Sequence, residues 1–554
     1  MTIQQQVRTN ETLLFCGGIF LLVLVMYARS LFNGFVLWDD NLLILENPIS
    51  HGLSLSHIWQ AFTTYDPDLY VPLTFISFQI NYLIGGLHPF IYHLTNVLLH
   101  AGNAILVGWI IFWLSKKKSV AIFTALLFAA HPINVEAVAW ASARKDVLSS
   151  FFFLLSLGLF LQWRDVKHRG WYAGGLISFL CGLLSKVSIV PLPLILVMTD
   201  WYRTRKISKD SLLATAPFFL LSVILGVVSL YGKAGGSQTM TAKLLVGFKA
   251  VVFSLWHLVW PFGYSVVYPF VGEATIGRID LVIPLIIVLA ASAAAWMLRK
   301  RFPTLSFGWA WFLLLLAPSF LTAAKGQDVV TALYLTSDRY VYLAAIGIFF
   351  VAAAGLFRIW KGPVRVKQGI VIAIVLLLGN LSALQSLVWK NTETLLRSAL
   401  ANYPDSAIAH NNLGAYYDSI GDSDAAAREY AAAVEGGGTS DAWFNVGVTA
   451  MREKRSEDAI AAFTRAVELR PTFVNAQLNL GGLLTNAGRI EEAVEHLLAA
   501  QKLDPVNVVV YLNLGIALEK GSDPVDAIAA YERVLTLDLE NAFAKQRLEA
   551  LRKK

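Results

Sequence analysis

Long apolar runs separated by short polar segments fill the first 390 residues of the chain. The first run extends from Leu13 to Phe35, interrupted by Arg29 and Asn33. Each run is near the length that crosses roughly 30 Å of hydrocarbon, although 119–131 and 188–201 are short. The pattern predicts eleven membrane-crossing helices, the later ten at about 91–114, 119–131, 147–163, 171–186, 188–201, 212–231, 279–298, 306–323, 340–358 and 368–389.

Basic residues in the loops orient these helices. Because Lys and Arg concentrate in short cytoplasmic loops, eleven spans place the N-terminus in the cytoplasm and the C-terminus outside. The basic clusters are Lys116–Lys118, Arg164/Lys167/Arg169, Arg203/Arg205/Lys206/Lys209, Arg299–Arg301 and Arg358/Lys361/Arg365/Lys367. Residues 244–262 are apolar enough to cross, but a crossing would reverse the next two clusters. We therefore expect this segment, which contains Trp256 and Trp260, at the outer interface or as a re-entrant piece.

After Trp389 the pattern becomes Ala-rich, charged and repetitive. Pairs of a hydrophobic residue and glycine recur at intervals of 33, 34 and 34 residues: Leu413-Gly414, Val446-Gly447, Leu480-Gly481 and Leu514-Gly515. This spacing is typical of tetratricopeptide repeats, which are pairs of antiparallel helices. We predict an all-α chain: a membrane helix bundle over 1–390, then an α-solenoid over 391–554 with repeats at about 407–439, 440–473, 474–507 and 508–541 and a capping helix.

Composition and charge agree with this division. Of the 554 residues, 56% are hydrophobic, far above an ordinary globular mixture. The net charge of +7 averages two unlike parts, because residues 1–403 hold 30 Lys+Arg against 16 Asp+Glu and residues 404–554 hold 15 against 22. The surplus cations belong to short membrane loops, so we expect no nucleic-acid partner. Cys16 and Cys181 lie in apolar helices and indicate no disulfide framework.

Two adjacent carboxylates, Asp39 and Asp40, stand where the first span leaves the membrane. Ionisable groups at such a place are functional candidates, because they are costly near hydrocarbon. The topology gathers further charges in the outer loops: Glu46, Asp66, Asp68, Glu136, Arg144, Lys145, Asp146, Lys325, Asp328, Asp338 and Arg339. A carboxylate-and-arginine cavity suits a lipid phosphate head group and an acceptor that must lose a proton. The alternative is that these are ordinary solvated loop charges.

Four blocks of sequence resemble one family, the transmembrane-and-TPR-containing O-mannosyltransferases and their bacterial relatives, within the GT-C glycosyltransferases. The blocks occur in the family's order: Phe35-Val36-Leu37-Trp38-Asp39-Asp40-Asn41 with Asn47-Pro48, then 92–104, then 131–150, then Asp338-Arg339-Tyr340-Val341-Tyr342-Leu343. The resemblance implies transfer of a mannose-like sugar from a polyprenyl or dolichyl phosphate to a hydroxyl acceptor outside the cytoplasm. A serine or threonine of a protein is the expected acceptor.

The resemblance also implies roles for residues of the site. Asp39 would be the catalytic base and Asp40 would orient it or the acceptor. Arg339, Arg144 and Lys145 would stabilise the leaving phosphate, since guanidinium groups pair well with phosphate oxygens. Glu136, His131 and Asp338 are further outer-face polar candidates. Some GT-C enzymes need a divalent cation at the first-loop carboxylates and others do not, and the sequence leaves this open.

Two departures bear on the substrate. Position 338 is Asp where animal members more often have Glu, and the run Arg144-Lys145-Asp146 is closer to bacterial relatives. The sugar and the acceptor therefore stay open. The spacing of His93, His100 and His131 does not form a recognisable metal-ligand set, and buried contacts between helices are the expected role for these residues.

Asparagines on the repeats suggest how an acceptor is held. Asn412, Asn445, Asn479 and Asn513 recur beside the hydrophobic–glycine pairs, on the first helix of each repeat. Such a line of side chains would hold an extended peptide on the concave face by its backbone amides. The alternative is that they bond neighbouring helices.

The expected location is a bacterial inner membrane with the repeats in the periplasm, or an endoplasmic-reticulum membrane with the repeats in the lumen if the source is eukaryotic. Two other functions compete with a glycosyltransferase. A non-enzymatic scaffold would use the repeats alone and has no need of the outer-face charges. A transporter of lipid-linked glycans would carry ionisable residues near mid-membrane, where the spans show few, Lys186 being the main exception at a span boundary.

Overall fold

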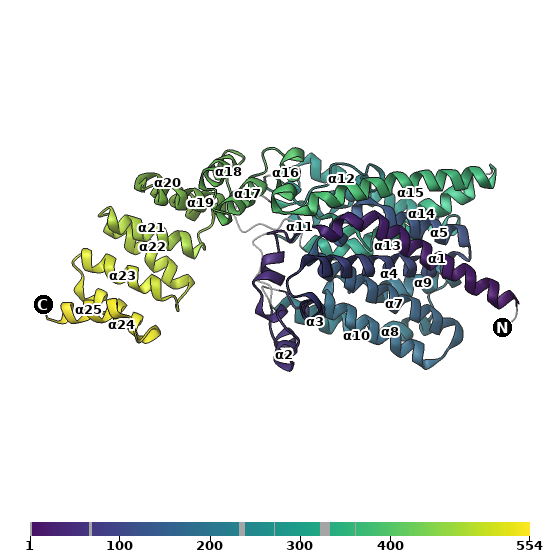
Figure 1. The fold of residues 1–554 in the computed structure, drawn as a ribbon, viewed down its shortest axis with the longest axis horizontal. Coiled ribbons are helices and arrows are strands. Elements are labelled where there is room, and N and C mark those ends of the chain that lie inside the picture. Colours follow the sequence, from purple (N-terminus) through teal and green to yellow (C-terminus); the bar gives the residue numbers. More distant parts are fainter. Residues whose placement is uncertain are drawn as a thin grey trace. The chain divides into compact units, whose positions relative to one another are not determined.

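A computed structural model describes residues 3–65, 69–231, 239–270, 272–321, 333–360 and 362–553. Asp66, Asp68, Lys325 and Asp328, which the sequence places in outer loops, lie outside these residues. The described residues are mostly helical, as the sequence predicts, with one pair of two-residue strands, Pro269–Phe270 (β1) and Leu333–Tyr334 (β2). The chain divides into a membrane unit that ends at Asn402 and a second unit, which holds the repeats from Tyr403 onward and also takes in Pro269, Phe270 and Leu333 of the strand pair (Figure 1).

The membrane unit is a bundle of long helices joined by short ones. Its α-helices are α1 (Ile3–Tyr27), α2 (Leu55–Thr63), α3 (Pro72–Gly85), α4 (Pro89–Ser115), α5 (Lys118–Ala130), α6 (Val135–Ala139), α7 (Arg144–Val166), α8 (Arg169–Ser185), α9 (Leu192–Thr204), α10 (Lys209–Tyr231), α11 (Met240–Val259), α12 (Ile279–Met297), α13 (Pro303–Leu316), α14 (Ala345–Ile359), α15 (Val364–Ser386) and α16 (Thr392–Asn402). The short helices that matter for the site are η2 (Asn41–Leu45), η5 (Ala141–Ala143), η9 (Asp338–Val341) and η10 (Leu387–Lys390).

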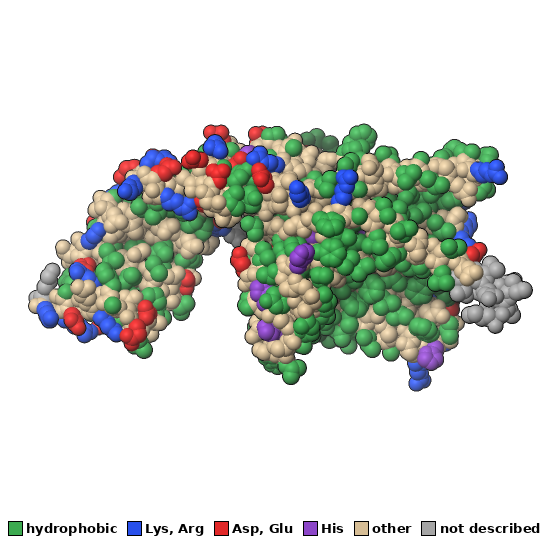
Figure 2. Space-filling view, viewed as in Figure 1, with side chains coloured by type: hydrophobic (Ala, Val, Ile, Leu, Met, Phe, Trp, Pro, Cys, Tyr) green, Lys and Arg blue, Asp and Glu red, His purple; other side chains and the backbone are tan. Residues whose placement is uncertain are grey.

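Within the described residues, eight helical segments are long and apolar enough to cross a membrane, and a ninth is possible if the bent pair α5–α6 counts as one span. Helices α8, α9 and α14, at 17, 13 and 15 residues, also match predicted spans but are shorter. Hydrophobic side chains cover much of the membrane unit on the face shown in Figure 2, and charged ones gather on the repeats. The chain is a multi-pass membrane protein by these criteria, and eleven spans stays a prediction.

The predicted cytoplasmic clusters meet one another at one end of the bundle. Arg164 pairs with Asp200 at 2.9 Å, and Tyr202 bonds Thr304 at 2.9 Å. The guanidinium carbon of Arg358 lies 5.3 Å from the ring centroid of Phe302. The other end of α7 carries Lys145, which is separated from Arg164 by about 28 Å of helix at 1.5 Å per residue. The site charges therefore lie at the end of the bundle opposite the basic clusters.

Helix α11, one of the eight helices that could cross a membrane by length and composition, contacts the ends of α12 and α13 that lie nearest the site. Lys249, near its middle, pairs at 2.7 Å with Asp280 at the start of α12. Gly247 approaches the ring of Phe320, which follows α13. The carbonyl of Leu258, near its end, accepts a hydrogen bond from His131 at 3.1 Å. Since α12 and α13 each have their other end at the basic clusters, these contacts belong to the site end, and the interfacial or re-entrant placement of residues 244–262 stays a prediction.

A proline turns the chain at the centre of the site. Helices α5 and α6 meet at 55°, and Pro132 stands at the break. Proline offers no N–H to a helix and disfavours helical geometry in the residue before it, so His131 adopts an extended conformation. The turn directs the short α6 across the end of the bundle, and α6 carries Glu136.

The repeat unit consists of four helix pairs and a final helix: α17 (Ala407–Ser419), α18 (Ser423–Glu435), α19 (Ser440–Arg452), α20 (Ser456–Leu469), α21 (Val474–Asn486), α22 (Ile490–Leu503), α23 (Val508–Lys520), α24 (Pro524–Leu537) and α25 (Ala542–Arg552). The recurring glycines explain the pairing. A Cβ added at Gly447 would lie 2.8 Å from Phe463, and one at Gly481 would lie 2.6 Å from Leu497. Only glycine lets the second helix of each pair approach this closely.

Candidate active site

The two first-loop carboxylates have different surroundings. Asp40 is buried, and its two oxygens accept the backbone N–H groups of Val36 and Ser142, each at 2.9 Å. Burial raises the pKa of Asp40 to about 6, against the lowering effect of these hydrogen bonds. Asp39 keeps 35% of its side chain exposed and pairs with Lys145 at 3.3 Å. Asp40 therefore fixes the loop on η5, and Asp39 is the carboxylate that faces outward.

Arg339 is held by Glu136. Glu136 accepts the backbone N–H of Arg339 at 3.0 Å and a second hydrogen bond from its guanidinium Nη1. Only 13% of the Arg339 side chain and 4% of the Glu136 side chain are exposed. Burial lowers the pKa of Arg339, but the negative charges of Glu136, Asp146 and Asp39, together with Tyr340, outweigh it and raise the pKa overall. Asp39 thus lies within electrostatic reach of Arg339.

The indole of Trp140 lies against the cations of both ion pairs, Lys145–Asp39 and Arg339–Glu136. The guanidinium carbon of Arg339 lies 5.1 Å from its ring centroid, and the Lys145 ammonium lies 5.5 Å from it. Both distances fall within the range of cation–π attraction. Trp389 stacks on Trp140 with the ring centroids 5.5 Å apart. The structure therefore brings Asp39, Lys145, Glu136 and Arg339 together at one end of the bundle, from loops far apart in the sequence.

A third ion pair, which the sequence did not single out as part of the site, lies beside them. Lys186 bonds Asp146 at 2.5 Å, and its ammonium lies 5.5 Å from the ring centroid of Tyr340. Arg339 lies 5.0 Å from the same ring. Among the described residues, Asp146 Oδ2 and Arg339 Nε are buried polar atoms with no hydrogen-bond partner. The position of Lys186 at a span boundary was the only sequence signal for it.

Arg144 lies apart from this cluster. Its guanidinium is fully buried and bonds Asn96 at 2.5 Å, Ser77 at 3.2 Å and the carbonyl of Tyr92 at 2.8 Å. These partners belong to α3 and α4, so Arg144 fastens the start of α7 to them. Because these partners enclose the guanidinium completely, Arg144 has no exposed donor that could bind a phosphate. We therefore assign Arg144 a structural role, in contrast to the phosphate-binding role that the sequence suggested.

Asp338 and His131 make buried contacts at the same end of the helix bundle. Asp338 is buried and accepts the Tyr268 hydroxyl at 2.9 and 2.8 Å, with His257 Nδ1 3.7 Å from its Oδ1. Burial raises the pKa of Asp338. His131 bonds the carbonyl of Leu258. Both residues hold the segments that carry Glu136 and Arg339, and Tyr268 is a partner that no sequence motif indicated.

The asparagines of the repeats differ in their partners. Asn445 donates to the side-chain oxygen of Asn411 in the preceding repeat at 2.9 Å. Asn412 donates to the carbonyl of Ile408 within its own helix at 2.8 Å. Asn479 and Asn513 are half-buried at the equivalent register. One pair therefore bonds neighbouring repeats, and the peptide-binding role stays a prediction.

The first-loop carboxylates do not present a ready cation site. Both oxygens of Asp40 accept backbone N–H groups, and Asp39 faces an ammonium. Across the part of the chain that the structure describes, no three His, Cys, Asp or Glu side chains converge as metal ligands would. Both carboxylates are therefore already engaged in the described residues, and a divalent cation at this place stays a prediction.

Comparison with known proteins supports the resemblance that the sequence motifs indicated. A family model described as tetratricopeptide repeat matches residues 393–441, 416–472, 447–508 and 478–542. Protein O-mannosyl-transferase TMTC4 of Homo sapiens is 24% identical over 483 residues, covering 74% of this chain and 64% of that protein. Protein O-mannosyl-transferase TMTC2 of Mus musculus is 32% identical over 206 residues, covering 35% of this chain and 24% of that protein.

A shorter match and a solved structure complete the comparison. Protein O-mannosyl-transferase TMTC3 of Homo sapiens is 38% identical over 141 residues, covering 24% of this chain and 15% of that protein. The crystal structure of YrrB, a TPR protein, is 18% identical with a TM-score of 0.26, covering 33% of this chain and 89% of that one. The chain thus has TMTC-type O-mannosyl-transferases as homologues and carries TPR repeats, and it spans less than two thirds of the length of these relatives.

Proposed function

We propose that this chain is a membrane glycosyltransferase that moves a mannose-like sugar from a polyprenyl or dolichyl phosphate to a serine or threonine hydroxyl of a protein, on the extracytoplasmic face. The observation that carries the proposal is the shared surface of Trp140, where Lys145, paired with Asp39, and Arg339, paired with Glu136, both lie. A base and two phosphate-binding cations are what such a transfer requires. The names of the relatives support a sugar transfer to protein.

Asp39 acts as the base. The acceptor hydroxyl gives its proton to the Asp39 carboxylate while its oxygen attacks the anomeric carbon of the donor. The bond between that carbon and the phosphate oxygen breaks, and the lipid phosphate leaves with the electron pair. One displacement inverts the anomeric configuration. Asp40 keeps Asp39 in place, because its hydrogen bonds to Val36 and Ser142 fix the loop.

Lys145 and Arg339 receive the phosphate. In the absence of donor, each cation is neutralised by a carboxylate, Asp39 for Lys145 and Glu136 for Arg339. A phosphate that draws Lys145 towards itself weakens the Lys145–Asp39 ion pair at the moment when a base is needed, which makes the Asp39 carboxylate a stronger proton acceptor. Arg339 can add a bond from its buried Nε, which has no partner among the described residues. Donor binding thus activates the base.

The repeat unit presents the protein acceptor. Tetratricopeptide repeats offer a concave surface to which each repeat contributes its first helix. The stripe of Asn412, Asn445, Asn479 and Asn513 lies on these first helices. Amide side chains bond a peptide backbone without selecting its side chains, so this surface would hold an unfolded or extended segment of many sequences.

The test is transfer of labelled mannose from polyprenyl-phosphate mannose to protein in membranes that contain either the wild type or Asp39→Asn. We expect labelled protein with the wild type and none with the variant. A scaffold would give no transfer with either protein. A transporter would move labelled lipid across sealed vesicles equally well in both, without labelling protein. Equal expression of the two proteins in the membrane is the control.

A further inference from the structure

The buried carboxylates of the membrane unit differ in how completely their oxygens are bonded. The described residues contain five of them: Asp40, Glu136, Asp146, Asp200 and Asp338. In four of these, both oxygens accept a hydrogen bond. The oxygens of Asp200, for example, bond Arg164 at 3.1 Å and Ser211 at 2.7 Å. Asp146 is the exception, because its Oδ2 is buried and has no hydrogen-bond partner among the described residues.

The surroundings of Asp146 place this oxygen within the proposed donor site. Its other oxygen, Oδ1, accepts the Lys186 ammonium at 2.5 Å, and that ammonium lies 5.5 Å from the ring centroid of Tyr340. Arg339 lies against the same ring at 5.0 Å. The negative charge of Asp146 is one of the causes that raise the pKa of Arg339, so the two side chains are within electrostatic reach. A ligand whose phosphate is held by Arg339 therefore brings its neighbouring atoms next to Asp146.

The two unbonded atoms of this cluster differ in what they can bind. Arg339 Nε is a donor, and it suits an oxygen of the phosphate. Asp146 Oδ2 belongs to a carboxylate that faces an ammonium, so it accepts hydrogen bonds and donates none. A phosphate oxygen would be repelled there, whereas a hydroxyl group donates a hydrogen bond and carries no charge. The sugar-phosphate end of the proposed donor carries both complementary groups, and its hydrocarbon chain carries neither.

The Asp146–Lys186 ion pair can open without disturbing the helices. Asp146 is fixed in the first turn of α7 and has 7% of its side chain exposed, against 17% for Lys186. Lys186 follows the last residue of α8, and its ammonium ends a flexible four-carbon stem. Lys186 can therefore turn towards an incoming phosphate and make room for a hydroxyl at Asp146.

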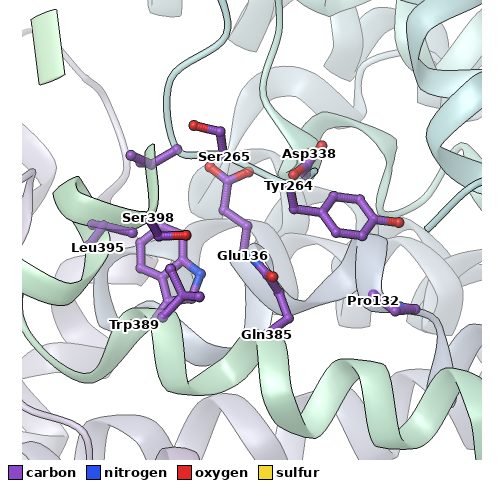
Figure 3. A pocket seen from close by; sticks show the side chains of 11 residues that line it. Pro132, Glu136, Tyr264, Ser265, Asp338, Gln385, Trp389, Leu395 and Ser398 are labelled. Atoms are coloured by element: carbon purple, nitrogen blue, oxygen red, sulfur yellow. The ribbon is translucent and has the colours of Figure 1, made fainter. Parts of the chain in front are cut away.

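The small pocket beside the cluster is not an alternative place for the sugar (Figure 3). Glu136 and Asp338 line it, and it has room for about one water molecule. The oxygens of Glu136 already accept hydrogen bonds from Arg339, and those of Asp338 accept the Tyr268 hydroxyl. Neither carboxylate has an oxygen left for a ligand in the way that Asp146 has.

We propose that Asp146 binds a hydroxyl group of the donor sugar through Oδ2 and thereby selects the sugar that is transferred. The inference rests on the proposed function, since it names the group that recognises the sugar at the same site. Arg339 and Lys145 hold the phosphate and Asp146 holds the sugar, so groups of opposite charge bind the two parts of the donor. A sugar without this hydroxyl leaves Oδ2 buried and unbonded, which disfavours it.

The test compares polyprenyl-phosphate mannose with analogues that each lack one hydroxyl of the mannose. The purified full chain transfers each sugar to the same threonine-containing protein. With the wild type, we expect one analogue to have a kcat/KM lower than that of mannose by roughly 10- to 100-fold. In Asp146→Ala, this analogue and mannose should react at nearly equal rates. If Asp146→Ala does not fold, Asp146→Ala combined with Lys186→Met serves instead, because it leaves neither charge buried without its partner.

The matched control is Asp200→Ala combined with Arg164→Met, which removes a buried ion pair at the other end of the bundle and should keep the wild-type discrimination. Thermal shift with polyprenyl phosphate, which lacks the sugar, verifies that each variant is folded and binds phosphate. If every analogue reacts like mannose in the wild type, or if the discrimination persists without Asp146, Oδ2 holds only a buried water and the inference is overturned. A wild type that transfers no mannose to any acceptor would overturn the proposed function, and the inference with it.

Discussion

Glu136 accepts two hydrogen bonds from Arg339, one from the backbone N–H and one from the guanidinium, across 203 residues of sequence. The first bond fixes η9 on α6, and the second aims the guanidinium. Both groups are nearly buried, so removing either leaves a charge without its partner in low dielectric. This pair, rather than the loops alone, defines where the phosphate of the proposed donor would lie.

Arg339 and Arg144 should respond differently to the same substitution. Lysine keeps the charge but loses the planar fork that binds phosphate. We expect Arg339→Lys to remain folded and to lower kcat/KM for the donor by about 100-fold, a loss of about 3 kcal/mol. Arg144→Lys should instead lower the melting temperature, because it breaks bonds to Asn96, Ser77 and Tyr92. Donor kinetics and melting curves of both variants check this. Equal effects of the two substitutions on donor kinetics would contradict this difference in role between Arg339 and Arg144.

Asp40 should make stability depend on pH. Its pKa is raised from 3.8 to about 6 by burial, so the folded chain keeps this proton at pH values where the unfolded chain has lost it. The stabilisation is complete below the unfolded value and is lost as the pH rises through about 6, by up to about 3 kcal/mol. Asp338, whose pKa burial also raises, acts in the same direction.

The measurement is the melting temperature of the wild type and of Asp40→Asn between about pH 4.5 and 6.5. Asparagine does not titrate, and it has one acceptor oxygen for the N–H groups of Val36 and Ser142. The variant should melt lower throughout, and the gap between the two proteins should narrow as the pH rises. Parallel curves would show that Asp40 does not titrate in this range.

The sequence predicted the architecture and the principal charges better than the roles of single residues. Apolar runs, basic loops and the 34-residue period suffice for the helices, because each depends on local pattern. Arg144 and Arg339 look equivalent in sequence, since both follow an apolar stretch in an outer loop. Only the fold shows that the guanidinium of Arg144 is enclosed by hydrogen bonds to Asn96, Ser77 and Tyr92. The guanidinium of Arg339 lies instead over Trp140 and pairs with Glu136.

Residues outside the motifs could not be predicted for the same reason. Lys186 and Tyr268 stand alone in sequence, and their partners Asp146 and Asp338 are 40 and 70 residues away. No periodicity links such pairs. For helix α11 the sequence contains two signals that disagree. Its length and composition fit a membrane span, whereas the basic clusters on either side of it favour a place at the outer interface.

The asparagine stripe should act on protein acceptors and not on short peptides. We expect replacement of Asn445, Asn479 and Asn513 together by alanine to raise KM for a folded or unfolded protein acceptor by about tenfold with kcat unchanged. The transfer rate to a short threonine peptide serves as the internal control, since it needs only the membrane unit. Circular dichroism should show intact helices. An unchanged KM for the protein acceptor would remove the peptide-binding role.

A substitution in one turn of the repeats should stabilise the repeat unit. Ser522 has φ of 61° in the turn between α23 and α24, where the equivalent residues Gly421 and Gly488 have φ of 83° and 80°. The left-handed conformation costs a non-glycine residue roughly 1–2 kcal/mol, partly offset by the greater freedom of unfolded glycine. Ser522→Gly should therefore stabilise this helix pair by about 0.5–1 kcal/mol.

Hydrogen exchange of peptides from α23 and α24 in the whole chain measures this gain as slower exchange. Ser423→Gly, at the first helical position of α18, is the control and should give no gain. If α23 and α24 exchange faster in Ser522→Gly than in the wild type, the left-handed conformation of Ser522 is not a source of strain.

The most direct test of the central claim, that Asp39 is the base and that the cations beside it hold the donor, is a kinetic separation in the purified protein. Asp39→Asn removes the base and keeps the size of the side chain. The expected result is a fall in kcat for mannose transfer of at least about 1,000-fold, with the affinity for polyprenyl-phosphate mannose unchanged or higher because Lys145 is no longer held by a carboxylate. An Asp39→Asn protein that transfers mannose at the wild-type kcat would contradict the assignment of the base, and with it the proposed mechanism.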